Sequence, residues 1–292
     1  MRASAQMVTA AVLMCSLGHA HAHTLFAKPE SHFVTPNTDV SLPFINGSFH
    51  VSESSIKGRS RASADVLLPS GDTDSFLENE WTLSDKVTRG RYEFGAEGTY
   101  FIGLATRPHT IRLAAEKFNR YLKSEGLSDQ IAERKIAGES DTAVVERFSK
   151  FAKSAIQAGD KLSENFANPL GYPVEIIPDV NTFALTEGEQ FAATIYKDGK
   201  PLADTLVFAS HEAHIDENTE SEYSDLVRVR SDENGQVRFT LGQSGNWYVR
   251  FIDLRKKDES EYWYTGILTA LGLEEPRIFY ESLWATLTFH VR

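Results

Sequence analysis

The chain has 292 residues, and its 30 basic and 41 acidic side chains give a formal net charge of −11. This acidic balance argues against nucleic acid and anionic membranes as partners, and it is compatible with the binding of cations. Hydrophobic residues make up 41% of the sequence, enough to build one or two cores in a chain of this length.

The first twenty-two residues have the pattern of a secretory signal peptide. A positive start precedes an apolar run over 7–17, and Ala-His-Ala at 20–22 is a small-x-small cleavage site. The apolar run is too short to span a bilayer, so we expect it to be removed with the signal. The single cysteine, Cys15, would leave with it. We therefore expect a soluble, cysteine-free periplasmic protein.

The N-terminal part of the mature chain, 23–110, is predicted to be a β-sandwich domain. It contains short runs of strand-forming residues bounded by Gly, Pro, Asn and Ser. The stretch 91–108 is typical of two strands around a glycine-containing turn. In the second strand alternation places Phe101 on one face and Ile102 on the other.

The next part, 111–165, is predicted to be a helical insertion. Helices are expected from Leu113 to Gly126, from Ser128 to Gly138 and from Asp141 to Gly159, each ending at a glycine. In the third of these, apolar residues recur at helical spacing. We expect the insertion to pack its apolar face on a sheet.

The remainder, 166–292, is predicted to be an immunoglobulin-like β-sandwich domain. Asp-Gly at 198–199 and Asn-Gly at 234–235 each separate two strand patterns and predict hairpins. The last run, 282–292, alternates cleanly between apolar and polar residues. The fold class expected overall is mainly β, with two sandwich domains around the helical insertion.

His23 is the leading candidate for a metal ligand. If cleavage follows Ala22, His23 becomes the N-terminal residue, and its α-amine and imidazole can chelate one ion. Nitrogen donors of this kind suit late divalent metals such as copper, nickel and zinc. Cleavage after Ala20 is the alternative, and it would remove this site.

Three further histidines are candidates to complete the site. His211 and His214 form a His-x-x-His motif that could face one ion if the segment turns, but not if it is extended. His50 lies at an expected strand edge. His32 and His290 are expected at the surface, without a ligand role.

Several stretches of the chain resemble one family of periplasmic proteins. They include "LFAKPESHF" from Leu25, "GTYFIGLATRPHTIRLAAEKFNRYLKSEGL" and the closing "ESLWATLTFHVR". The chain is similar in these stretches to the domain-of-unknown-function 4198 family, described as a periplasmic component of cobalt/nickel uptake. The resemblance implies two sandwiches with a helical insertion, a role in handling a divalent transition metal, and the N-terminal histidine as a ligand. The chain departs from the family at His109, where a basic or small residue is usual, and over 262–284, which is longer.

We therefore expect a metal-binding protein without catalytic activity that delivers nickel or cobalt to a membrane transporter or receives it from an outer-membrane receptor. Copper and zinc fit the donor chemistry nearly as well. Two alternatives stay open. One is an immunoglobulin-like interaction module without metal, and the other is a copper-dependent oxidative enzyme with an N-terminal histidine site.

Overall fold

The computed structural model describes residues 23–84, 86–214, 226–257 and 278–292. Within these residues the protein is mainly β, as predicted, with three sheets and two α-helices. The predicted signal peptide, residues 215–225 and most of the stretch 262–284 lie outside them. In the described part of the chain, no helix has the length and apolar character needed to cross a membrane.

The described strands form three sheets. The first contains, in spatial order, β1 (Thr24–Ala27), β3 (Thr38–Gly47), β7 (Val87–Phe94) and β6 (Trp81–Leu83). The central sheet runs in the order β15 (Val227–Arg230), β14 (Leu206–His211), β17 (Gly245–Lys257), β18 (Ile278–Val291), β10 (Val144–Ala158), β8 (Gly98–Thr106), β4 (Arg61–Leu67) and β5 (Thr73–Ser75). β2 (Phe33–Val34) and β9 (His109–Leu113) also pair with β10. The third sheet contains β11 (Val174–Pro178), β12 (Gln190–Lys197), β13 (Lys200–Pro201) and β16 (Gln236–Thr240).

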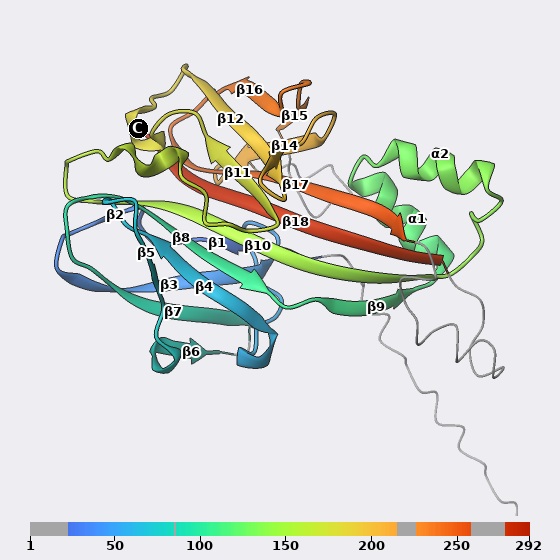
Figure 1. Ribbon diagram of the computed structural model, residues 1–292, viewed down its shortest axis with the longest axis horizontal. Helices are drawn as coiled ribbons and strands as arrows, with labels where there is room; N and C mark the ends of the chain where they lie inside the picture. Colours follow the sequence, from blue (N-terminus) through green and yellow to red (C-terminus); the bar gives the residue numbers. More distant parts are fainter. Residues whose placement is uncertain (1–22, 85, 215–225, 258–277) are drawn as a thin grey trace, which may run out of the picture.

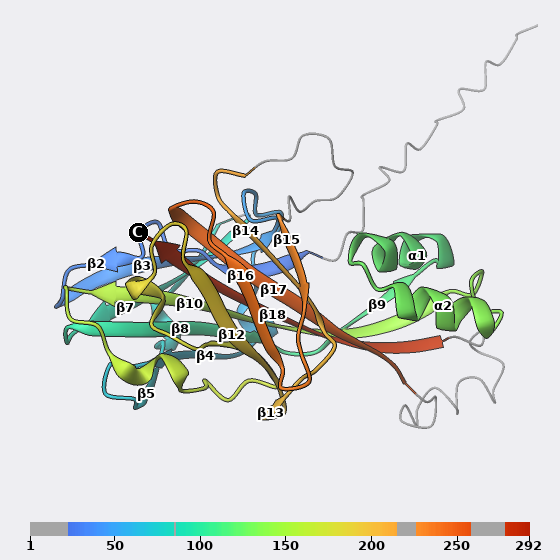
Figure 2. The same cartoon turned by 90° about the horizontal axis from the view of Figure 1, so that it is seen from above.

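The helices are α1 (Ala115–Ser124) and α2 (Ser128–Ile136). Short 3-10 turns, named η1 to η4, lie at Gly58–Ser60, Glu78–Glu80, Glu164–Ala167 and Thr182–Ala184. The strands β10, β17 and β18 are long and lie side by side, and they run out to the two helices at one end of the molecule (Figure 1, Figure 2). The structure confirms the first two predicted helices as α1 and α2. The glycines expected to end them, Gly126 and Gly138, both have positive φ.

The central sheet is covered on both faces, so its strands separate two hydrophobic cores. The core against the third sheet contains Phe101 and Phe151, whereas the core against the first sheet contains Ile102 and Ala152. β8 confirms the predicted alternation, since Phe101 and Ile102 face opposite cores. A third core forms where α1 packs on the outer ends of β10, β17 and β18.

The third predicted helix, Asp141–Gly159, is wrong, because this segment forms strand β10 instead. β10 is buried on both faces, so it shows no polar face to mark a period of two. A strand of this kind cannot be distinguished from a buried helix by hydrophobic spacing alone. It pairs in parallel with β18 from Val144 opposite Ile278 to Ser154 opposite Thr288, and it thereby makes the central sheet continuous.

The two predicted hairpins have different outcomes. Asp198 and Gly199 both have positive φ and connect β12 to its neighbour β13, so this hairpin is confirmed. The hairpin at Asn234-Gly235 is wrong, because the turn connects β15 in the central sheet to β16 in the third sheet. A turn signal fixes the local reversal of the chain but not the partner of the strand that follows.

The last strand, β18, confirms the predicted alternation. Ala285, Leu287 and Phe289 face the core against the third sheet. On the other face the hydroxyl groups of Thr286 and Thr288 donate hydrogen bonds to the backbone carbonyls of Leu25 and Ala27 in β1, at 2.8 and 2.5 Å. β18 therefore positions the start of the described chain, which carries His23.

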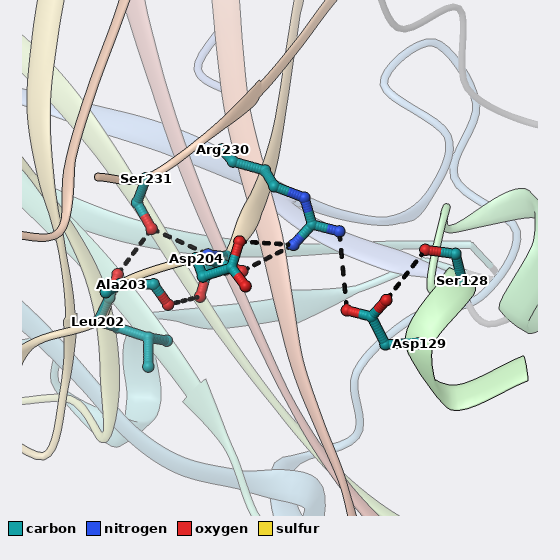
Figure 3. A network of polar contacts seen from close by, with 8 residues as sticks. Ser128, Asp129, Leu202, Ala203, Asp204, Arg230 and Ser231 are labelled. Atoms are coloured by element: carbon teal, nitrogen blue, oxygen red, sulfur yellow. Dashed lines mark hydrogen bonds and ion pairs between the residues drawn. The ribbon is translucent and has the colours of Figure 1, made fainter. Parts of the chain in front are cut away.

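Among the ion pairs that connect the helical segment to the sheets, two differ in their burial. Glu125, directly after α1, pairs with Arg250 of β17 at 2.6 Å, and both side chains are buried. Asp129 of α2 lies 3.9 Å from Arg230 of β15, which also contacts Asp204 at 3.1 Å (Figure 3). The first contact is inside the protein, whereas the second is at its surface.

Replacing Arg230 by alanine should lower the free energy of unfolding by no more than about 1 kcal/mol. The guanidinium is 41% exposed, so water and salt already screen its two ion pairs. Urea unfolding at low and high salt measures the effect, with Arg238→Ala as a control because Arg238 bonds to Gln236 instead of a carboxylate. A loss above about 2 kcal/mol would mean that this surface contact is essential for docking the helices.

Candidate functional site

A cavity of about 410 Å³ lies where the first sheet, the central sheet and α1 meet. Its wall combines apolar side chains with a few ionisable ones, and the ionisable ones are His23, His109, Tyr121, Glu146 and Lys150. Pockets that bind small organic molecules have this composition and a volume of about 300–1,000 Å³. The cavity is therefore the first place to look for a function.

Two neighbouring strands supply most of the wall. In β9, alternate residues line the cavity, namely His109, Ile111 and Leu113. In β10 the residues that line it also alternate, namely Glu146, Phe148 and Lys150. The two strands are antiparallel, with His109 opposite Phe148 and Ile111 opposite Glu146. One face of this strand pair thus presents an acid, a base and an imidazole to the same space.

Glu146 lines the cavity and takes part in a small hydrogen-bond network. The hydroxyl of Ser282 donates to its carboxylate, and the hydroxyl of Tyr121 does so at 3.4 Å. The indole of Trp284 in turn donates to the Ser282 hydroxyl at 3.0 Å. Burial raises the pKa of Glu146, although these hydrogen bonds and the charge of Lys150 act in the opposite direction. The network fixes the carboxyl group while burial favours its protonated form.

Lys150 is a buried amine whose polar partner is neutral. Its Nζ donates a hydrogen bond of 2.7 Å to the side-chain oxygen of Asn46 and lies 5.3 Å from the ring centre of Phe148. The residue is 7% exposed. Among the described residues no carboxylate lies within 4.0 Å of Nζ. Burial lowers the pKa of Lys150 from 10.5 to about 7, and the nearby Glu146 only partly opposes this effect.

His23 stands at the edge of the same cavity. Its side chain is 23% exposed, and its Nε2 lies 3.4 Å from the carboxylate of Glu53. The next residue, Thr24, begins β1 and pairs with Gly47 of β3. The position of His23 on the wall is therefore set by a paired strand and not by a free tail.

The other predicted ligands lie elsewhere. His211 ends β14 and packs on Trp247, with 5.0 Å between ring centres. The backbone N–H of His214 donates to the carbonyl of His211 at 3.0 Å, so the segment turns as the His-x-x-His motif requires. The two rings are 5.9 Å apart, and the imidazole of His50 bonds to the His214 backbone. The structure thus brings these three histidines together, but none of them lines the cavity with His23.

The sequence predicted His32 at the surface, but this prediction is wrong, because the residue is 1% exposed. Its Nδ1 bonds to the carbonyl of Ala155 at 2.7 Å, and burial lowers its pKa to about 4. His290 is half-buried and bonds to Asn246 at 2.8 Å. The alternation in β18 predicted the face on which His290 lies. The burial of His32 could not be predicted, because it depends on the pairing of β2 with β10.

Across the described ranges, no group of three or more His, Cys, Asp or Glu side chains is arranged to hold a metal ion. Sequence reasoning did not select Glu146 or Lys150, because their segment looked helical. Once the segment is assigned as a strand, their spacing of four residues places them on one face.

The chain belongs to the family described as Domain of unknown function (DUF4198), whose model matches residues 20–252. This confirms the family named from the sequence, but the description assigns no activity to it. No curated protein matches the chain.

Several solved structures are similar at low identity. The D0-D1 domain of intimin is 11% identical, with 91% of this chain and 97% of that chain covered and a TM-score of 0.22. A DUF4785 family protein from Legionella pneumophila is 9% identical, with coverage of 78% and 51% and a TM-score of 0.27. Trypsin-activated alpha-2-macroglobulin from Escherichia coli is 9% identical, with a TM-score of 0.21, and this chain spans 16% of its length. We draw no argument from likenesses at these scores.

Proposed function

We propose that this chain is an exported protein that binds a divalent transition metal, nickel or cobalt first among them, at the edge of the cavity where His23 lies. In this proposal the signal peptide is cleaved after Ala22. The mature protein then works in the periplasm, where it buffers the metal or delivers it to a membrane uptake system without catalysing a reaction. We also propose that the first and third sheets each form an immunoglobulin-like sandwich domain with the central sheet, which the two domains share.

One observation carries the proposal: the imidazole of His23 lies on the cavity wall with the Glu53 carboxylate 3.4 Å away. Cleavage would add the α-amine of His23 as a second nitrogen donor beside that imidazole. His109 lines the same cavity and has suitable chemistry to complete the set. The site depends on the α-amine, so side chains alone do not form it.

Calorimetric titration of the mature chain tests the proposal. The chain that begins at His23 is freed of metal and titrated in turn with nickel, cobalt, copper and zinc. We expect one ion to bind per chain, and His23→Ala to remove this binding. Binding that His23→Ala leaves intact and the triple variant of His50, His211 and His214 removes would move the metal to that second group of histidines. No binding of any of the four metals would leave only an interaction module, whereas tight copper binding together with peroxide-dependent sugar oxidation would favour the oxidative enzyme.

Adding one alanine before His23 should weaken nickel binding by about tenfold or more. The extension converts the α-amine into an amide, which no longer chelates, but it leaves the imidazole and Glu53 in place. Calorimetry on the two chains measures the ratio of dissociation constants, and His50→Ala serves as the control with unchanged affinity. Equal affinity of the extended and the native chain would show that the N-terminal site is wrong.

A further inference from the structure

The cavity has a second feature that a metal site does not use. Its apolar wall, formed by residues such as Ile56, Ile111 and Phe148, encloses a volume suited to an organic molecule and far larger than an ion needs. Lys150 lies in this wall and has only the neutral Asn46 as its hydrogen-bond acceptor among the described residues. A lysine carries three N–H donors, so the single bond to Asn46 leaves two for a ligand.

The buried amine of Lys150 lacks the paired carboxylate that Lys153, the next lysine of β10, has. Lys153, three residues further along β10, points to the opposite face, and there Glu175 pairs with it at 3.1 Å. Lys150 has no such carboxylate, and Glu146, the acidic residue of its own strand, is already held by Ser282 and Tyr121. Buried charges in proteins are normally paired, so an amine without a paired anion indicates a partner that comes from outside.

We propose that the cavity binds a small organic carboxylate, with the carboxylate on the Lys150 ammonium and Asn46 beside it, and the apolar body against Ile56, Ile111 and Phe148. The carboxylate would lie at the cationic group of the wall, whose other ionisable groups are His23, His109, Tyr121 and Glu146. The proposal does not require a metal, and it holds whether or not His23 binds one.

The test compares carboxylates with their uncharged amides on the mature chain. The probes are hexanoate and phenylacetate, with hexanamide and phenylacetamide as matched neutral molecules. The buffer is freed of metal with a chelating resin, because a soluble chelator would itself supply carboxylates. We expect each acid to bind about tenfold or more tightly than its amide, since hydrogen bonds to charged groups are the stronger ones.

The variant Lys150→Met should remove this preference, so that acid and amide bind equally. Lys150→Arg, which keeps the charge, should retain part of it. His50 does not line the cavity, so the variant His50→Ala should bind all four probes as the native chain does. Cooperative unfolding of each variant shows that it has folded. The proposal is overturned if no probe binds, if acid and amide bind equally to the native chain, or if Lys150→Met still prefers the acid.

Carboxylate affinity should also fall as the pH rises from 7 to 9, by up to about tenfold per pH unit. The ionisable groups that face Lys150 are Glu146 on its own strand, His109 on β9, His23 before β1 and Tyr121 on α1. The pKa of Lys150 is about 7, so its ammonium loses its proton in this range, whereas burial raises the pKa of Glu146 and so favours its neutral form, which repels an anion less. Measurement of the same titration on Lys150→Met isolates the lysine, because that variant should show no such fall. An affinity of the native chain that is flat from pH 7 to 9 would contradict the role of the ammonium.

Discussion

Replacing Glu175 by glutamine is expected to lower the free energy of unfolding by about 3–5 kcal/mol. The carboxylate accepts hydrogen bonds from the backbone N–H groups of Leu170, Gly171 and Tyr172, at 3.0, 2.9 and 3.2 Å, and it pairs with Lys153. Every one of its four partners is a donor, and both oxygens are used. A glutamine amide in either orientation must point an NH₂ group at donors, and it also leaves the Lys153 charge buried without a partner.

Urea unfolding of the two chains measures this loss. Glu116→Gln is the matched control, because Glu116 pairs with Arg120 on the exposed face of α1 and should change the free energy by no more than about 0.5 kcal/mol. The double variant Lys153→Met with Glu175→Leu should recover part of the loss, since it removes both charges. A loss below about 1 kcal/mol in Glu175→Gln would contradict this account of how β10 of the central sheet is joined to β11 of the third.

Replacing Lys150 by methionine is expected to have the opposite effect and to raise the free energy of unfolding at pH 7 by roughly 3 kcal/mol, because the fall of the pKa from 10.5 to about 7 corresponds to about 5 kcal/mol and the lost hydrogen bond to Asn46 offsets part of it. Each unit of pKa shift corresponds to about 1.4 kcal/mol. Burial lowers the pKa of Lys150 from 10.5 to about 7 in the folded chain, so folding must displace a proton or bury a charge. Methionine fills a similar volume without that cost, and Asn46 is only half-buried, so water can replace its lost partner.

The pH dependence gives this prediction its sign. Between pH 7 and 10.5 the unfolded chain holds more protons at Lys150 than the folded chain, so the native protein gains stability from this residue as the pH rises. The advantage of Lys150→Met should therefore be largest at pH 7 and below, and it should shrink toward pH 10. Unfolding in urea at pH 7 and 9 measures both values. A variant that is less stable than the native chain at pH 7 would show that Lys150 supports the fold instead of serving a ligand.

A residue that lowers stability and lines a cavity has a functional role more often than a structural one. The two lysines of β10, Lys150 and Lys153, differ in this respect although they lie on one strand. Lys153 should be needed for stability because it pairs with the buried carboxylate of Glu175, whereas Lys150 should be dispensable for stability and needed for binding.

The elements with one exposed face or a distinct end could be predicted from the sequence. The hairpin at Asp198-Gly199 has the turn residues that its positive φ values demand, and α1 ends where Gly126 allows it. β10 could not be recognised, because a strand covered by a sheet on each face has apolar residues on both. The pairing of β10 with β18 could not be predicted either, since about 120 residues separate the two strands and no local signal specifies a parallel partner.

The site was predictable to a smaller extent. His23 could be selected because its chemistry depends on its position after the cleavage motif, and the structure places it on the cavity wall. Glu146 and Lys150 were missed because their segment was interpreted as a helix with an apolar stripe packed on a sheet, and such a helix leaves its charged residues in solvent. The grouping of His211 with His214 followed from their spacing, but their separation from His23 depends on how the central sheet arranges β14 and β1.

Crystals of the mature chain grown with nickel provide the most direct test of the central claim that the cavity beside His23 is where this protein binds its ligand. Anomalous scattering locates the ion without assumptions about its ligands. We expect one strong peak at His23, with the α-amine and the imidazole both coordinated, and Glu53 or His109 beside them. A peak at His50, His211 and His214, or no peak in crystals soaked at saturating nickel, would contradict the claim.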